Sequence, residues 1–123
     1  MISFSKKFIV SPDKTAKKIG SGDLEVLATP AMIAMVENTA KEYLHKELAA
    51  EETSVGSFIE AKHIKPSSVG AEVVVEVSVT EQEKTKINFS FNVFENDQLV
   101  ATGGHQRVVV LTELFLTKLD KSN

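Results

Sequence analysis

The spacing of apolar and polar residues predicts a first strand near the start of the chain and a long helix after it. Phe4, Lys6, Phe8 and Val10 alternate with Ser5, Lys7 and Ile9, which indicates a strand that is exposed on one side or lies at an edge. The next regular stretch begins at Thr29 and predicts a helix that ends near Leu48. Residues 31–36 are all apolar, so we expect this end of the helix to be covered on every side.

After Glu51 and Glu52 the pattern changes from a helical period to a period of two. Four runs predict four strands, over residues 55–64, 71–80, 87–93 and 99–111. In the first of them one face carries Val55, Ser57, Ile59, Ala61 and His63. Gly103 and Gly104 interrupt the last run, where we expect a bulge that changes the inward face. Residues 118–123 are polar and are expected to fray.

These elements define the fold class. Short turns between strands imply antiparallel neighbours, and one helix against one face of such a sheet is an α+β arrangement. A helix with apolar residues all round suits a curved sheet of about five strands that wraps it. The 123 residues are expected to form a single domain, residues 1–123. The open edges of such a sheet agree with pairing in a symmetric homodimer.

Composition excludes several classes of function. A net charge of -3 gives no basic surface for nucleic acid. Cysteine is absent, which excludes disulfides, thiol chemistry and cysteine-ligated metals. No apolar run is long enough to span a bilayer, so we expect no membrane partner. The first residues lack the long apolar segment of a signal peptide, and the default location is the cytoplasm.

One charged residue conflicts with the helical pattern. Glu37 shares a stripe with Ile33, Ala40 and Leu44, so a carboxylate is aligned with apolar neighbours. A buried carboxylate needs a hydrogen bond, an ion pair or a proton. At the start of the same helix, Thr29 fits the N-cap and Pro30 the first helical position. We take the Glu37 conflict as the first indication of a functional site.

A set of short motifs follows this pattern in a fixed order. The motifs are Gly20-Ser21-Gly22-Asp23, residues 26–32, Glu37, Gly56, His63 followed by Pro66 and Gly70, and Gly104-His105-Gln106-Arg107. Over roughly residues 15–110 the sequence resembles the fluoroacetyl-CoA thioesterase-like family of hotdog-fold proteins. The resemblance implies the hotdog fold, in which a curved antiparallel sheet wraps a long central helix. It also implies homodimers with active sites between the subunits.

The resemblance assigns roles to five residues. It implies that Thr29, Glu37 and His63 are catalytic, that Gly56 faces the substrate, and that Arg107 is the late-strand arginine. From the residues alone, each has a second interpretation. Thr29 could be a plain N-cap, Glu37 a carboxylate with a structural partner, His63 a satisfied core histidine, and Arg107 a surface side chain. Lys62, Lys65 and Arg107 are candidates for contacts to the phosphates of coenzyme A.

The distance between two of these residues limits how they can act together. Thr29 and Glu37 are eight residues apart, which is about 12 Å along a straight helix. A dimer that brings Thr29 of one chain to Glu37 and His63 of the other would remove this difficulty. Alternatively, the substrate or a water molecule lies between them.

Three functions follow from this reading. The first is a thioesterase that hydrolyses a small acyl-CoA with Glu37, His63 and Thr29, without a metal or other cofactor. The others are a non-catalytic acyl-CoA-binding module and an enoyl-CoA hydratase-type lyase. One departure concerns the substrate. The fluoroacetyl-specific enzyme has phenylalanines before its threonine, whereas residues 20–28 contain no aromatic residue. The resemblance therefore does not extend to selectivity for the fluoroacetyl group.

Overall fold

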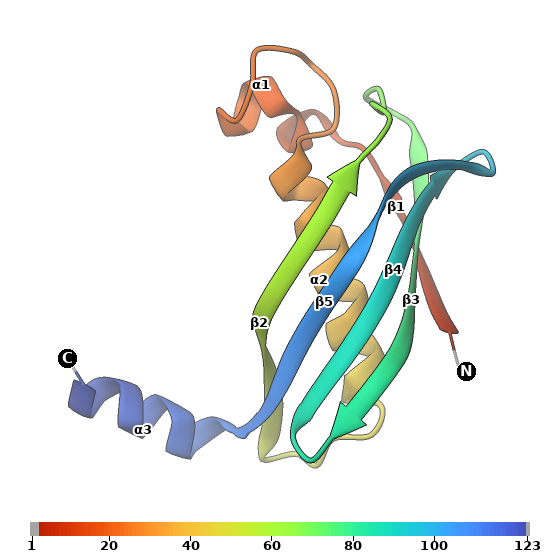
Figure 1. Cartoon of the computed structure of the whole chain (residues 1–123). Coiled ribbons are helices and arrows are strands. Elements are labelled where there is room, and N and C mark those ends of the chain that lie inside the picture. The colour runs from red at the N-terminus through yellow and green to blue at the C-terminus, as the bar shows by residue number, and fades with distance from the viewer. Residues whose placement is uncertain (1–2, 123) are drawn as a thin grey trace.

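A computed structural model describes residues 3–122 (Figure 1). In chain order its elements are β1 (Ser3–Ile9), the 3-10 turn η1 (Pro12–Lys14), α1 (Ala16–Ile19), α2 (Thr29–His45), β2 (Glu52–His63), β3 (Glu72–Glu83), β4 (Lys86–Glu95), β5 (Gln98–Leu111) and α3 (Thr112–Ser122). The strands form one antiparallel sheet in the order β1-β3-β4-β5-β2. The predicted α+β arrangement of one long helix and five strands is therefore confirmed.

The core lies between α2 and one face of the sheet, and Figure 1 shows α2 running along that face. From the helix it buries Met32, Met35 and Val36, and from β3 and β4 it buries alternate residues such as Val75 and Phe91. The expectation that residues 31–36 are covered on every side is wrong. Ala34 is exposed and Ile33 is only half-buried, so one side of the helix near Glu37 is open.

The faces of β2 differ from the prediction because the strand contains an unpredicted bulge. Gly56 pairs with Arg107 and Phe58 pairs with Gln106, which leaves Ser57 as an extra residue. An extra residue shifts the alternation by one position. The buried Ser54 therefore shares the helix-facing side with Ile59. The prediction that Val55 and Ser57 lie on the same face as His63 is wrong.

The bulge expected at Gly103 and Gly104 is absent, because β5 pairs there without interruption to both neighbours. Its irregularity lies at Val100 instead, where the pairing with β4 shifts. Gly103 serves close packing. A Cβ atom at this position would lie 2.0 Å from the carbonyl oxygen of Glu60 and 2.9 Å from the ring of Phe91. Only glycine allows the strands and this ring to approach so closely.

The helix ends also differ from the prediction. α2 ends at His45 rather than near Leu48, with Lys46 at its C-cap. Residues 118–122 do not form a frayed tail but belong to α3, which begins directly after β5. Asn123, the last residue of the expected tail, lies outside the described residues. Within residues 3–122 no helix is both long enough and apolar enough to cross a membrane.

Candidate functional site

The first candidate centre lies at the start of α2. The Thr29 hydroxyl and Nδ1 of His63 are joined by a hydrogen bond of 2.8 Å. The prediction that Thr29 caps the helix is wrong, because the N-cap is Ala28, which has extended backbone angles and no side-chain cap bond. Thr29 is instead the first helical residue, and its hydroxyl is directed to the end of β2. The exposed hydroxyl and the imidazole therefore form a pair within one chain.

His63 has one ring nitrogen without a partner. Burial lowers the pKa of His63 below its ordinary value, so the ring is neutral at pH 7. A neutral imidazole has one donor nitrogen and one acceptor nitrogen. Nδ1 contacts Thr29, whereas Nε2 is buried and has no hydrogen-bond partner among the described residues. An acceptor at Nε2 would fix the tautomer in which Nδ1 can take a proton from Thr29.

A pocket opens beside this pair. It has a volume of about 450 Å³, and its walls include Thr29, Pro30, His63, Leu27 and Lys65. The first turn of α2 is next to it. The backbone N–H groups of a first helical turn have no acceptor within the helix and create a positive potential. In α2 Pro30 has no N–H and the N–H groups of Ala28 and Met32 donate to backbone carbonyls, so Thr29 and Ala31 are the donors that remain in this turn. The pocket can therefore hold a small group whose oxygen becomes negatively charged during a reaction.

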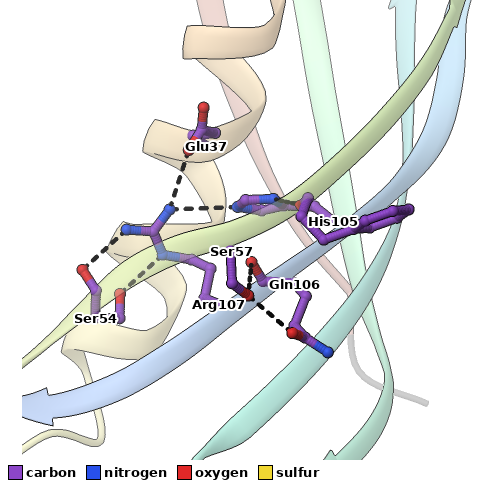
Figure 2. A network of polar contacts seen from close by, with 7 residues as sticks. Glu37, Ser54, Ser57, His105, Gln106 and Arg107 are labelled. Carbon is purple, nitrogen blue, oxygen red and sulfur yellow. Dashed lines mark hydrogen bonds and ion pairs between the residues drawn. The ribbon is translucent and has the colours of Figure 1, made fainter.

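The second candidate centre surrounds Glu37 and is built on β2 and β5 (Figure 2). Oε2 of Glu37 lies 3.6 Å from Nη1 of Arg107, and the Glu37 side chain is 39% exposed. Arg107 is buried. It donates from Nε to the hydroxyl of Ser54 at 2.8 Å and from Nη2 to the Ser54 carbonyl at 3.0 Å. The guanidinium is thus fixed in orientation, with one nitrogen directed to the carboxylate.

The imidazole in this second centre belongs to His105. Nδ1 of His105 lies 2.7 Å from the carbonyl oxygen of Phe58, which can only accept, so Nδ1 carries the proton. Nε2 then accepts from Nη1 of Arg107 at 3.3 Å. Burial lowers the pKa of His105, the bond to Phe58 raises it, and Arg107 lowers it again. His105 is therefore a neutral residue that holds Arg107.

Gly56 lies against the carboxylate. A Cβ atom at this position would be 2.6 Å from Oε2 of Glu37, 3.4 Å from Cε1 of His105 and 3.5 Å from Nη1 of Arg107. A side chain here would force the carboxylate to move. The absence of a side chain at Gly56 thus leaves room for Glu37 in its present position.

The structure brings together some of the predicted site residues and separates others. Thr29 and His63 are in contact, and Glu37 is grouped with Gly56 and Arg107. The expected contact between Glu37 and His63 does not exist within one chain, because the two centres lie at different heights along α2. Within residues 3–122, no three histidine, aspartate or glutamate side chains are placed to share a metal ion.

Sequence reasoning assigned no role to two members of the second centre. His105 has the same strand parity as Arg107, and that parity was the available signal for its inward position. Ser54 gave no signal, because its inward direction depends on the bulge at Ser57.

The chain is similar to thioesterases. A family model described as fluoroacetyl-CoA-specific thioesterase matches residues 10–113. No curated protein matches the chain. Among solved structures, the fluoroacetyl-CoA thioesterase FlK superposes with a TM-score of 0.92 at 23% identity, over 99% of this chain and 95% of that chain. Another FlK structure, a mutant with 23% identity, holds fluoroacetate and CoA.

Two further structures show the same fold. A hot-dog-like protein from Thermanaerovibrio acidaminovorans has a TM-score of 0.89 and 26% identity, over 98% of this chain and 90% of that chain. A thioesterase superfamily member from Thermus thermophilus has a TM-score of 0.87 and 20% identity, with coverages of 98% and 92%.

Proposed function

The chain belongs to the fluoroacetyl-CoA-specific thioesterase family, and from this premise we propose how its own residues hydrolyse an acyl-CoA thioester. Its fold is the hotdog fold, and it is a thioester hydrolase. The observation that carries the proposed mechanism is the Thr29–His63 hydrogen bond, with the second ring nitrogen buried and unpartnered. A hydroxyl paired with a neutral imidazole is the arrangement that activates an oxygen nucleophile.

The proposed reaction begins with proton transfer from Thr29 to Nδ1 of His63. The Thr29 oxygen attacks the thioester carbonyl, and the first turn of α2 stabilises the oxyanion. The C–S bond then breaks, the thiolate of coenzyme A takes the proton from His63, and an acyl ester remains on Thr29. In the second half, His63 takes a proton from water, and the water oxygen attacks the carbonyl carbon of the acyl ester. The bond between the acyl group and the Thr29 oxygen then breaks, and His63 gives its proton to that oxygen. The products are the free acid and the thiol.

The third catalytic group is proposed to come from a second copy of the chain. Glu37 is about 12 Å along the helix axis from Thr29 of the same chain, but its carboxylate is partly exposed and the adjacent side of α2 is open. In a homodimer, Glu37 of one subunit would accept a hydrogen bond from Nε2 of the partner's His63. Arg107, held by Ser54 and His105, would orient that carboxylate. Arg107 therefore acts as a positioning residue. The proposed chemistry uses the side chains of Thr29, His63 and Glu37 together with the backbone of the first turn of α2, and it is proposed to need no metal.

The proposed substrate is a small acyl-CoA without selectivity for fluorine. The pocket beside Thr29 is small and has one basic wall residue, Lys65. No aromatic residue is present in residues 20–28 to close it. The direct experiment is to measure thiol release from a series of CoA esters from acetyl to long-chain. We expect the highest kcat/KM with short chains. Binding of acyl-CoA without any thiol release would overturn the proposed function.

Replacement of Gly56 by alanine is expected to reduce kcat by about 10- to 100-fold, because the new Cβ would displace the Glu37 carboxylate. Gly104→Ala is the matched control. It adds the same atom on the neighbouring strand, where the nearest contact would be an ordinary 3.7 Å. Both variants should unfold at similar temperatures. Equal activity of the two variants would show that the position of Glu37 is not important.

The titration of His63 should depend on Glu37 of the partner. Burial alone lowers the pKa of His63, whereas a carboxylate at Nε2 stabilises the charged ring and raises it. The Glu37→Gln variant keeps the burial and loses the charge. Its His63 ring should therefore titrate at a lower pH than the ring of the wild-type protein, as followed by the ring proton signals in NMR. An unchanged pKa would place Glu37 away from His63 in both copies.

A further inference from the structure

α3 carries large apolar side chains that are exposed. Figure 1 shows it leaving the end of β5 and extending away from the sheet, past the edge formed by β2. Thr112 is tied back by one backbone bond to the carbonyl of Glu51 at 3.0 Å. Beyond this point Leu114, Phe115 and Leu116 are 40–53% exposed. A helix of 11 residues is marginal in water unless an apolar side is packed. A second surface that covers these apolar side chains would therefore stabilise α3.

The open edge beside α3 indicates which surface this is. β2 is an edge strand of 12 residues, and Phe58 on it is 54% exposed. Such an edge is normally paired or covered. The homodimer of the proposed function covers it if the two β2 strands pair antiparallel about a two-fold axis. This inference rests on that dimer.

The proposed active site sets the register of this pairing. Glu37 lies against Gly56, and its partner atom is on His63, so Gly56 of one copy must lie near the partner's His63. In an antiparallel pair the same register runs Glu52 past His63, where the partner's β2 ends, to the exposed residues that follow it. Leu111 is next to Glu52 in its own sheet, and α3 follows Leu111 directly. The helix therefore emerges beside residues 64–70 of the partner.

Residues 64–70 of the partner are complementary to α3 in charge and in exposed apolar side chains. Ile64 and Val69 are 56% and 43% exposed. Lys65 is exposed and lines the pocket of Thr29. At the root of α3 is a hollow of about 630 Å³, whose walls include Leu111, Leu114 and the acidic Glu51 and Glu113. In the two-fold dimer this acidic and apolar hollow would lie beside the partner's Lys65 and Ile64, which line the opening of its pocket.

We propose that α3 is an arm that docks on a second copy of the chain, against residues 64–70, and forms one wall of the partner's acyl-CoA pocket. Leu114 and Phe115 pack on Ile64 and Val69, and Glu113 is close to Lys65. Each subunit thus contributes to the partner's site at two places. Glu37 lies inside the site, and α3 lies at the mouth of the pocket.

Cysteine cross-linking tests this placement, because the natural chain has no cysteine. Three double variants combine Ile64→Cys with Leu114→Cys, Phe115→Cys or Leu116→Cys, and each is treated with a short bismaleimide. We expect at least one to give a covalent dimer on a denaturing gel. Within one chain the two ends of β2 are about 40 Å apart, so the short linker cannot join Ile64 to α3 of the same chain. Phe115→Cys with Ile9→Cys is the control and should not react.

A kinetic measurement on the uncross-linked protein complements this test. The double variant Leu114→Lys, Phe115→Lys should raise KM for a short acyl-CoA about tenfold with little change in kcat, whereas Ile9→Lys, equally exposed on β1, should not. Unchanged KM together with no covalent dimer, in a protein that remains an active dimer by light scattering, would overturn the placement of α3 and leave the proposed function intact. A fully active monomer would overturn both.

Discussion

His63→Ala is expected to lower kcat/KM for short acyl-CoA esters by about three to four orders of magnitude. The variant removes the side chain that we propose takes the proton from Thr29, and an unassisted hydroxyl is a poor nucleophile at neutral pH. Thiol release under steady-state conditions measures the loss. His45→Ala, which changes an exposed histidine at the end of α2, should retain wild-type activity.

The fold should tolerate this change, because among residues 3–122 the ring of His63 makes one side-chain hydrogen bond and its other nitrogen has no partner. Circular dichroism and light scattering should therefore match those of the wild-type protein. A reduction of less than tenfold would rule out His63 as the base. Rapid-quench mass spectrometry adds a second criterion, since an acyl group on Thr29 should accumulate only when His63 is present.

Glu37→Gln is expected to lower kcat by about two to three orders of magnitude while the chain remains folded. The amide keeps the size of the side chain but removes the negative charge that would stabilise the protonated His63 of the partner. Thiol release again measures the loss. Glu47→Gln changes an exposed glutamate just after the same helix and should have no effect. Wild-type activity of Glu37→Gln would remove this residue from the mechanism.

Mixing the two inactive variants distinguishes a shared site from a site within one chain. In a heterodimer of Glu37→Gln and His63→Ala, one of the two sites receives an intact Glu37 from one subunit and an intact His63 from the other. Random exchange of subunits should therefore restore about a quarter of the wild-type activity. No recovery, with exchange demonstrated by mass, would place both residues in the site of a single chain.

The sequence pattern was sufficient for the architecture. The alternation in residues 71–80, interrupted only at Val74, and the apolar start of α2 together favour a long helix against an antiparallel sheet. It was not sufficient for the ends of elements. Leu114, Phe115 and Leu116 read as an extension of the last strand as easily as a helix, since a short apolar run has no clear period. These three apolar side chains are exposed, so the rule that apolar residues are buried does not place them either.

Only part of the site could be predicted from sequence. Glu37 was singled out because its charge conflicts with the stripe around it, and Thr29 and His63 were singled out through the family resemblance; their catalytic roles stay predictions. The contact between Thr29 and His63 depends on where β2 ends relative to α2, which is set by the whole sheet. Ser54 and His105 orient Arg107 through positions that no local pattern reveals. Such supporting residues are fixed by three-dimensional packing rather than by their neighbours in the chain.

The extra residue at Ser57 has a consequence for how this protein can change during evolution. It is the only reason that Ser54 and Gly56 point to the same side as His63. Loss of one residue from this stretch would leave the hydropathy of β2 almost unaltered, yet it would turn either Ser54, which supports Arg107, or the imidazole of His63 outward. Insertions and deletions should therefore accumulate in the hairpin turns among descendants of this gene, while the residue count between Ser54 and His63 stays constant.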